Sequence, residues 1–60
     1  MNEDRFFKVY ANLPLALRNE IIVVLPDIGP ITWNVAYIEL TKNTELGKTI
    51  VNKLIELHII

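Results

Sequence analysis

Apolar residues form two dense runs in the middle of the chain, and they recur at helical spacing towards both ends. The first run, Ile21–Leu25, contains five apolar residues, four of which are Ile or Val. Its short length and β-branched content predict a strand that is buried on both faces. Pro26, Asp27 and Gly29 follow it with the residue types of a tight turn. The chain is therefore expected to reverse direction after this strand.

The second run, Ile31–Leu40, is compatible with two structures. Seven of the eleven residues from Ile31 to Thr41 are β-branched or aromatic, which favours a strand paired antiparallel with Ile21–Leu25. If the segment were a helix instead, Thr32 could be its N-cap. The apolar stripe of that helix would consist of Trp33, Ala36, Tyr37 and Leu40.

Backbone hydrogen bonding favours the strand for this second run. If Ile31–Leu40 were helical, the strand Ile21–Leu25 would have no partner within the chain, and its buried N–H and C=O groups would be unpaired. We therefore expect a two-stranded antiparallel hairpin. The alternative is a single strand followed by two helices, with the strand paired across a dimer.

The N-terminal part of the chain is expected to be helical. Apolar residues recur at helical spacing through Glu3–Asn12, and Pro14 cannot continue an α-helix from the residues before it. Pro14 does suit the first position of a second, short helical turn over Pro14–Asn19. That turn would offer Leu15 and Leu17 to the core.

The last helix begins after Asn43 or Thr44, one of which is expected to cap it. Its apolar stripe consists of Leu46, Ile50, Val51, Leu54 and Leu57. Gly47 lies inside this helix and indicates a close approach of the helix to the sheet. The two apolar residues of the tail, Ile59 and Ile60, are expected to dock on the rest of the protein.

These elements predict one small α+β domain over residues 1–60, in which a two-stranded antiparallel hairpin is packed by one or two N-terminal helices and by a C-terminal amphipathic helix. A chain of this size buries only about 60% of the surface that its unfolded form exposes. Hydrophobic residues make up 52% of the sequence. One layer of helices covers one face of a hairpin, and both edges of the hairpin stay open. We therefore expect self-association, most simply as a symmetric homodimer.

The sequence offers little for catalysis or for metal binding. It has no cysteine, which excludes disulfides and thiolate zinc sites, and its single histidine, His58, follows the last helix. Asp27 and Glu39 could approach each other across the hairpin, but carboxylates in a turn and on a strand edge usually have no catalytic role. We expect no enzymatic activity, no catalytic residue, no metal ion and no cofactor.

Charge and hydropathy argue against nucleic acid and membranes as partners. Six basic and seven acidic residues are spread along the chain and leave a net charge of −1, and the strand Ile21–Leu25 has no side chain that could donate to a base edge. No apolar run reaches the ~20 residues that span a bilayer, and Met1–Arg5 lacks the basic-then-apolar pattern of a signal peptide. A cytoplasmic location is expected.

One stretch is loosely similar to a known class of proteins. Asn12-Leu13-Pro14, followed by Leu17-Arg18-Asn19-Glu20-Ile21, resembles the openings of small antitoxin-like proteins. The similarity covers about ten residues and implies no site residue. The resemblance implies an alternative function, that of an antitoxin-like or transcriptional regulator that binds nucleic acid as a dimer.

The function that the sequence favours is a small non-enzymatic protein-interaction module that self-associates. Trp and Tyr are frequent anchors of protein interfaces, and on a strand Trp33, Val35 and Tyr37 would share one apolar face. The candidate interface residues are Trp33, Val35, Tyr37, Ile28, Ile59 and Ile60.

Overall fold

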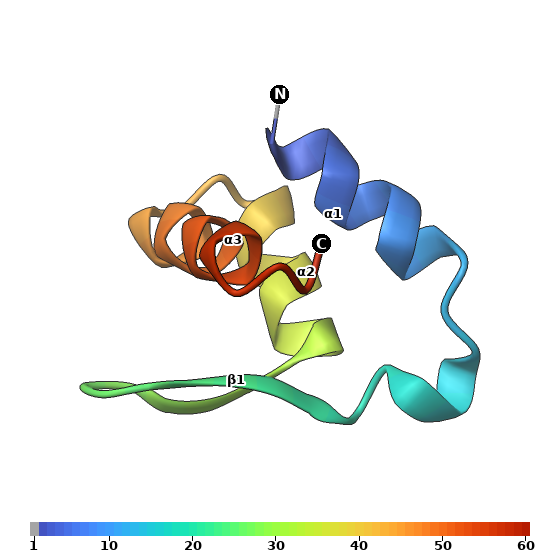
Figure 1. The fold of residues 1–60 in the computed structure, drawn as a ribbon, viewed down its shortest axis with the longest axis horizontal. Coiled ribbons are helices and arrows are strands. Elements are labelled where there is room, and N and C mark those ends of the chain that lie inside the picture. Colours follow the sequence, from blue (N-terminus) through green and yellow to red (C-terminus); the bar gives the residue numbers. More distant parts are fainter. Residues whose placement is uncertain (1) are drawn as a thin grey trace.

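The computed structural model describes residues 2–60 and places three α-helices on one side of a two-stranded sheet (Figure 1). In chain order the elements are α1 (Asn2–Ala11), the 3-10 helix η1 (Leu15–Leu17), β1 (Ile21–Leu25), β2 (Gly29–Thr32), α2 (Trp33–Thr41) and α3 (Glu45–Glu56). β1 and β2 form an antiparallel hairpin. The predicted α+β fold, a hairpin packed by helices from both ends of the chain, is confirmed.

The first helix agrees with its prediction to within one residue at each end. Glu3 and Asp4 occupy its first turn, where the helix dipole favours negative charge. The helix ends at Ala11, and Pro14 follows shortly after it. Phe6 is fully buried and fixes α1 against the other two helices.

The short helical turn expected at Pro14–Asn19 is present as η1, but its leucines are not part of the core. Leu15 is 76% exposed, and Leu17 is exposed as well. η1 lies beyond the end of the hairpin and level with it, away from the helices that cover the sheet (Figure 1). The prediction that these two side chains are buried is therefore wrong, because no helix packs closely enough on η1 to cover them.

The turn between the strands forms as expected. The Ile28 N–H donates to the carbonyl oxygen of Leu25 over 3.2 Å. Gly29 adopts φ +102°, a region that residues with a Cβ rarely enter. Val24 then lies opposite Pro30 across the pair. Pro30 has no N–H to donate. A sheet tolerates proline on an edge strand, and β2 is an edge strand because it pairs only with β1.

A register shift interrupts the hairpin between Ile21 and Val23, where β1 has one residue more than β2. Ile22 and Val23 both contact the core at this point, whereas Ile21 is 58% exposed. In a regular strand Ile21 and Val23 would share a face. The extra residue therefore turns Ile21 to the side of the sheet away from the core.

The second strand ends at Thr32, and the prediction of a strand over Ile31–Leu40 is wrong from Trp33 onward. The Thr32 hydroxyl oxygen accepts a hydrogen bond from the Val35 N–H over 3.1 Å and so caps α2. The four residues of β2 are enough to pair with β1. The hairpin and the helix are therefore both present, and the alternative of a single strand paired only across a dimer does not occur.

Helices α2 and α3 pack closely because Gly47 has no side chain. A Cβ atom at Gly47 would lie 2.8 Å from the backbone oxygen of Glu39 and 3.1 Å from the backbone nitrogen of Leu40. The predicted close approach is present, but its partner is α2 and not the sheet. The Gly47 N–H also donates to the Thr44 hydroxyl oxygen over 3.0 Å, which confirms Thr44 as the cap of α3.

The hydrophobic core lies between the helices and the inner face of the hairpin. It consists of Phe6, Val23, Leu25, Ile31, Ala36, Leu40, Ile50, Val51 and Leu54. Three of these residues belong to the predicted stripe of α3, so the expected orientation of that helix is confirmed. Leu57, the last member of the stripe, is exposed because α3 ends at Glu56.

Replacing Gly47 with alanine is expected to destabilise the protein, although alanine is the better helix former by about 1 kcal/mol. The new methyl group would meet backbone atoms of α2, which cannot rotate away, and overpacking of this kind costs about 1–3 kcal/mol. We expect Gly47→Ala to lower the free energy of unfolding in urea by about 1–2 kcal/mol, measured at a fixed protein concentration. Asn52→Ala, at an exposed position of the same helix, is the control and should change it by no more than about 0.5 kcal/mol. A Gly47→Ala protein more stable than the wild type would contradict the close packing of α2 on α3.

Candidate interaction surface

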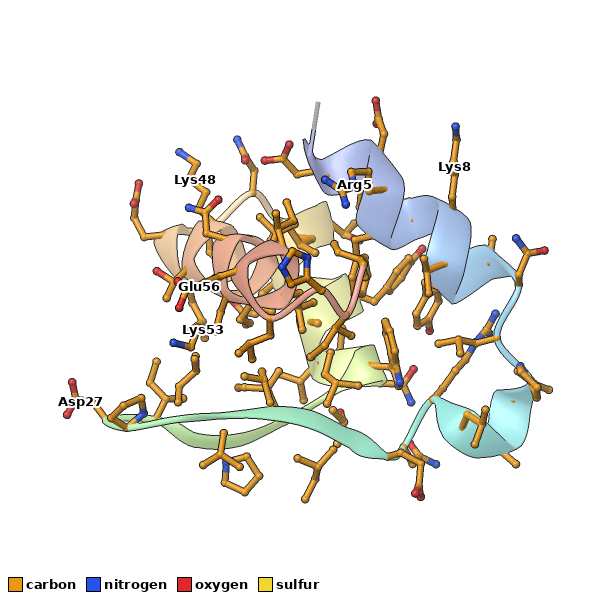
Figure 2. All side chains as sticks on the ribbon, in the orientation of Figure 1. Arg5, Lys8, Asp27, Lys48, Lys53 and Glu56 are labelled. Atoms are coloured by element: carbon orange, nitrogen blue, oxygen red, sulfur yellow. The ribbon has the colours of Figure 1, made fainter. Side chains whose placement is uncertain are left out.

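The helices cover one face of the hairpin, and the opposite face is open (Figure 1). We call this face the outer hairpin face and define it by Ile21, Val24 and Pro30. Val24 is 64% exposed, and Pro30, directly opposite it, is exposed as well. Side chains project from the sheet on this side, away from the helices (Figure 2). Neither strand contains a charged residue, so the outer hairpin face is uncharged, and Thr32, opposite Ile21, is the polar residue of the strands on this side.

Further exposed apolar residues flank the outer hairpin face at both ends. Ile28 lies in the turn between the strands and is largely exposed. At the other end of β1, the segment η1 lies level with the hairpin (Figure 1), and its residues Leu15 and Leu17 are exposed. Apolar side chains are therefore exposed from η1, along the hairpin, to its turn.

The apolar face predicted for Trp33, Val35 and Tyr37 on a strand is absent from the structure. Residues two apart share a face on a strand but not on a helix, and all three lie in α2. The Trp33 ring is half-buried, with its centroid 5.8 Å from that of Phe6. The Tyr37 ring stacks on Tyr10 with centroids 4.4 Å apart. Both aromatic residues thus form contacts within the chain, and an additional role in an interface stays a prediction.

The remaining interface candidates are divided between surface and core. Val35 and Ile28 are exposed, as is Ile59 at the end of the chain. Ile60 is half-buried and packs against the core, so docking of the tail is confirmed for this residue. Its carbonyl oxygen accepts a hydrogen bond from Arg5 Nη2 over 2.8 Å, which ties the tail to α1.

Helix α3 ends in a way that directs this tail back to the core. His58 adopts a left-handed conformation with φ +59°. Its N–H donates to the Ile55 carbonyl oxygen over 3.0 Å, and the Ile59 N–H donates to the Leu54 carbonyl oxygen over 2.8 Å. This pair of hydrogen bonds is a Schellman motif, which satisfies carbonyl groups that the helix leaves unpaired.

Sequence reasoning missed the residues that the structure exposes most clearly. Leu15 and Leu17 were assigned to the core, and Ile21 and Val24 to a strand buried on both faces. The signal was nevertheless present in the sequence. A uniformly apolar strand requires cover on both faces, and a single layer of helices supplies only one.

A polar network fixes η1 and the adjoining loop to the helices. The Tyr10 hydroxyl donates to Asn34 Oδ1 over 2.8 Å, and Asn34 Nδ2 donates to Asn19 Oδ1 over 2.8 Å. The Arg18 guanidinium lies 4.3 Å above the centre of the Tyr10 ring, a cation–π contact. Arg18 Nη2 also donates to the Tyr10 carbonyl oxygen over 3.3 Å. We call this network of Tyr10, Arg18, Asn19 and Asn34 the clamp, because it joins α1 and α2 to the loop that follows η1.

The side chains that could support chemistry are scattered. Among residues 2–60, no three His, Cys, Asp or Glu side chains are grouped closely enough to hold a metal ion. Asp27 lies at the tip of the hairpin (Figure 2), and Glu39 lies in α2, where its Oε1 accepts a hydrogen bond from the Thr44 hydroxyl over 2.6 Å. The long second strand that would have brought Glu39 towards Asp27 does not form. Over the same residues, no helix is long and apolar enough to cross a bilayer.

Removing the Tyr10 hydroxyl is expected to weaken the clamp without changing the stacking of the rings. Tyr10→Phe leaves Asn34 Oδ1 without its donor, so we expect the free energy of unfolding to fall by about 0.5–1.5 kcal/mol. The matched control is Tyr37→Phe, since the two rings stack on each other and the Tyr37 hydroxyl has no hydrogen bond within residues 2–60. Denaturation of both variants by urea makes the comparison. Equal losses at the two positions would show that the Tyr10 hydroxyl has no special role.

Comparison with protein-family models, with curated proteins and with solved structures found no match to this chain.

Proposed function

We propose that this chain is a small, non-enzymatic protein-interaction module that acts as a symmetric homodimer in the cytoplasm. The observation that carries the proposal is the open, apolar outer hairpin face. Contiguous apolar surface on a soluble protein commonly marks an interaction site. The absence of cysteine suits a reducing compartment.

The exposed side chains of the outer hairpin face supply part of the free energy that association requires. Fully burying a Val or Ile side chain is worth about 1.5–3 kcal/mol, so covering the exposed part of Ile21 or Val24 is worth about half of that. In a symmetric pair both residues are covered on both chains, so the gain is about 3–6 kcal/mol. Association costs about 4–15 kcal/mol in lost freedom. A micromolar dimer, at about −8 kcal/mol, therefore requires burial of further apolar residues beyond these two.

Electrostatic repulsion between two copies is weak. Each chain has a net charge of −1, and the outer hairpin face itself is uncharged. Two such faces can meet without bringing charged residues of the strands together, although the acidic residues Glu20 and Asp27 adjoin the ends of the strands.

Sedimentation and thermal melting test the proposal. We expect the wild-type protein to sediment as a species of twice 6.9 kDa at tens of micromolar and to dissociate on dilution. Because the dimer is stabilised by mass action, its melting temperature should rise with protein concentration. A single 6.9 kDa species with a constant melting temperature across a hundredfold dilution would disprove self-association.

The alternative function, a dimeric regulator that binds nucleic acid, has less support from the distribution of charge. Lys48 pairs with Glu45 at 3.5 Å, and Lys53 pairs with Glu56 at 3.3 Å. Arg5 and Arg18 are engaged within the chain as described. We therefore infer that few cations are free to neutralise phosphates.

A heparin column at low salt separates the two functions. We expect the protein to flow through, because a chain of net charge −1 with internally paired cations has little affinity for a polyanion. A small basic DNA-binding domain run under the same conditions is the positive control. Retention of the protein, with elution that depends on salt, would favour the regulator instead.

A further inference from the structure

We infer that the tail, residues 57–60, is a latch that holds α1 on the rest of the protein, so that α1 is released when the tail undocks. The tail follows α3, and its contact with α1 joins the two ends of the described chain. A latch of this kind couples two events, undocking of the tail and detachment of α1. It operates within one chain and does not depend on the proposed self-association.

Helix α1 is fixed to the rest of the protein by different contacts along its length. In the middle of the helix, Phe6 is its one buried side chain among residues 3–11. Near the end of α1, the clamp holds Tyr10. Near its beginning, Arg5 Nη2 donates to the Ile60 carbonyl oxygen over 2.8 Å. The tail therefore secures the first half of α1, on the other side of Phe6 from the clamp.

Ile60 contacts both the core and α1, through two different groups. Ile60 is half-buried, and its side chain packs against the core, which includes Phe6. Its carbonyl oxygen accepts the hydrogen bond from Arg5 on α1. The chain turns after α3 and runs towards α1 (Figure 1), and Arg5 lies on the side of α1 that faces the tail (Figure 2). When Ile60 leaves the core, its carbonyl group leaves Arg5 as well, so α1 loses this contact at the same time.

The docked tail is held lightly enough to open. Leu57, His58 and Ile59 are exposed, and the hydrogen bond between Arg5 and Ile60 is accessible to water. The left-handed conformation of His58 is unfavourable for a residue with a Cβ, and glycine is the usual residue at this position of a Schellman motif. Few buried contacts and exposed hydrogen bonds are properties of segments that open locally. The tail is therefore expected to undock while the hairpin stays folded.

Release of α1 uncovers aromatic surface on both sides of its contact with α2. In the docked state the centroid of the Phe6 ring lies 5.8 Å from that of Trp33, and the centroid of the Tyr10 ring lies 4.4 Å from that of Tyr37. Detachment of α1 separates both pairs of rings. Because linkage is reciprocal, anything that holds the tail off the core also favours exposure of these rings. The state of the tail thus controls a surface on other helices.

Hydrogen–deuterium exchange followed by mass spectrometry, at one protein concentration for all variants, tests the latch. Peptides from α1 report its detachment, and peptides from the hairpin report unfolding of the whole domain. We expect α1 of the wild type to exchange faster than the hairpin. Ile60→Ala removes most of the side chain that docks, so we expect α1 to exchange about tenfold faster than in the wild type. Leu57→Ala, at an exposed leucine of the tail, is the matched control and should leave the exchange of α1 within about twofold of the wild-type rate.

His58→Gly should change the exchange of α1 in the opposite direction. Glycine adopts the left-handed turn without the strain that a Cβ imposes, so the docked tail becomes more stable. We expect α1 to exchange about threefold more slowly than in the wild type.

Arg5→Met tests the α1 side of the latch. It removes the hydrogen bond to the tail, and we expect α1 to exchange about threefold faster. Lys8→Met is the matched control, because Lys8 is a second cation of α1 and points away from the rest of the protein (Figure 2). The helix dipole alone predicts the reverse order, since a positive charge is unfavourable near the start of a helix and favourable near its end. Faster exchange in Lys8→Met than in Arg5→Met would therefore overturn the inference.

Two further results would also overturn it. If Ile60→Ala leaves the exchange of α1 at the wild-type rate, α1 detaches while the tail stays docked, and the two events are independent. If α1 and the hairpin of the wild type exchange at one rate, α1 has no opening of its own and detaches only when the whole domain unfolds.

Discussion

A sheet of two strands has two faces, and this chain has one layer of helices to cover them. Most features of the structure follow from that shortage of covering surface. The inner face receives Phe6 from α1 and the stripe of α3, and together with α2 these residues enclose a small, fully apolar core. Among residues 2–60, no helix covers the outer hairpin face (Figure 1).

Close backbone packing and backbone hydrogen bonds at the helix ends support the small core. Gly47 lets α2 and α3 approach until backbone atoms almost touch, which removes the space that side chains would otherwise have to fill. Thr32 and Thr44 cap the two helices with their hydroxyl groups. Asn43 at the end of α2 and His58 at the end of α3 take left-handed conformations that let following N–H groups satisfy terminal carbonyls. The caps and the left-handed residues thus pair polar backbone groups and use almost no apolar surface.

The sequence was sufficient to predict features that depend on local chemistry. The strand Ile21–Leu25, the turn with Gly29 and the end of α1 before Pro14 each depend on a few neighbouring residues and are correct, and of the two predicted caps of α3, Asn43 and Thr44, the cap is Thr44. The change from strand to helix at Thr32 was missed because threonine suits both the end of a strand and the cap of a helix. The outward turn of Ile21 depends on a bulge, which has no signature in a run of β-branched residues. The exposure of Leu15 depends on how far the helical layer extends, and only the tertiary structure decides that.

The hydrogen bond from Arg5 to the carbonyl oxygen of Ile60 bears on how the chain gains and loses its structure. β1 pairs with β2, and α2 packs on α3, across short connections, so these two units involve contacts that are local in sequence. The contacts of α1 are different, since the Arg5 bond joins residues 55 apart. The entropy lost on closing a loop grows with its length, so docking α1 is the costliest closure in the molecule. Detachment of α1 therefore regains the most chain freedom, and opening of the native structure is expected to begin there.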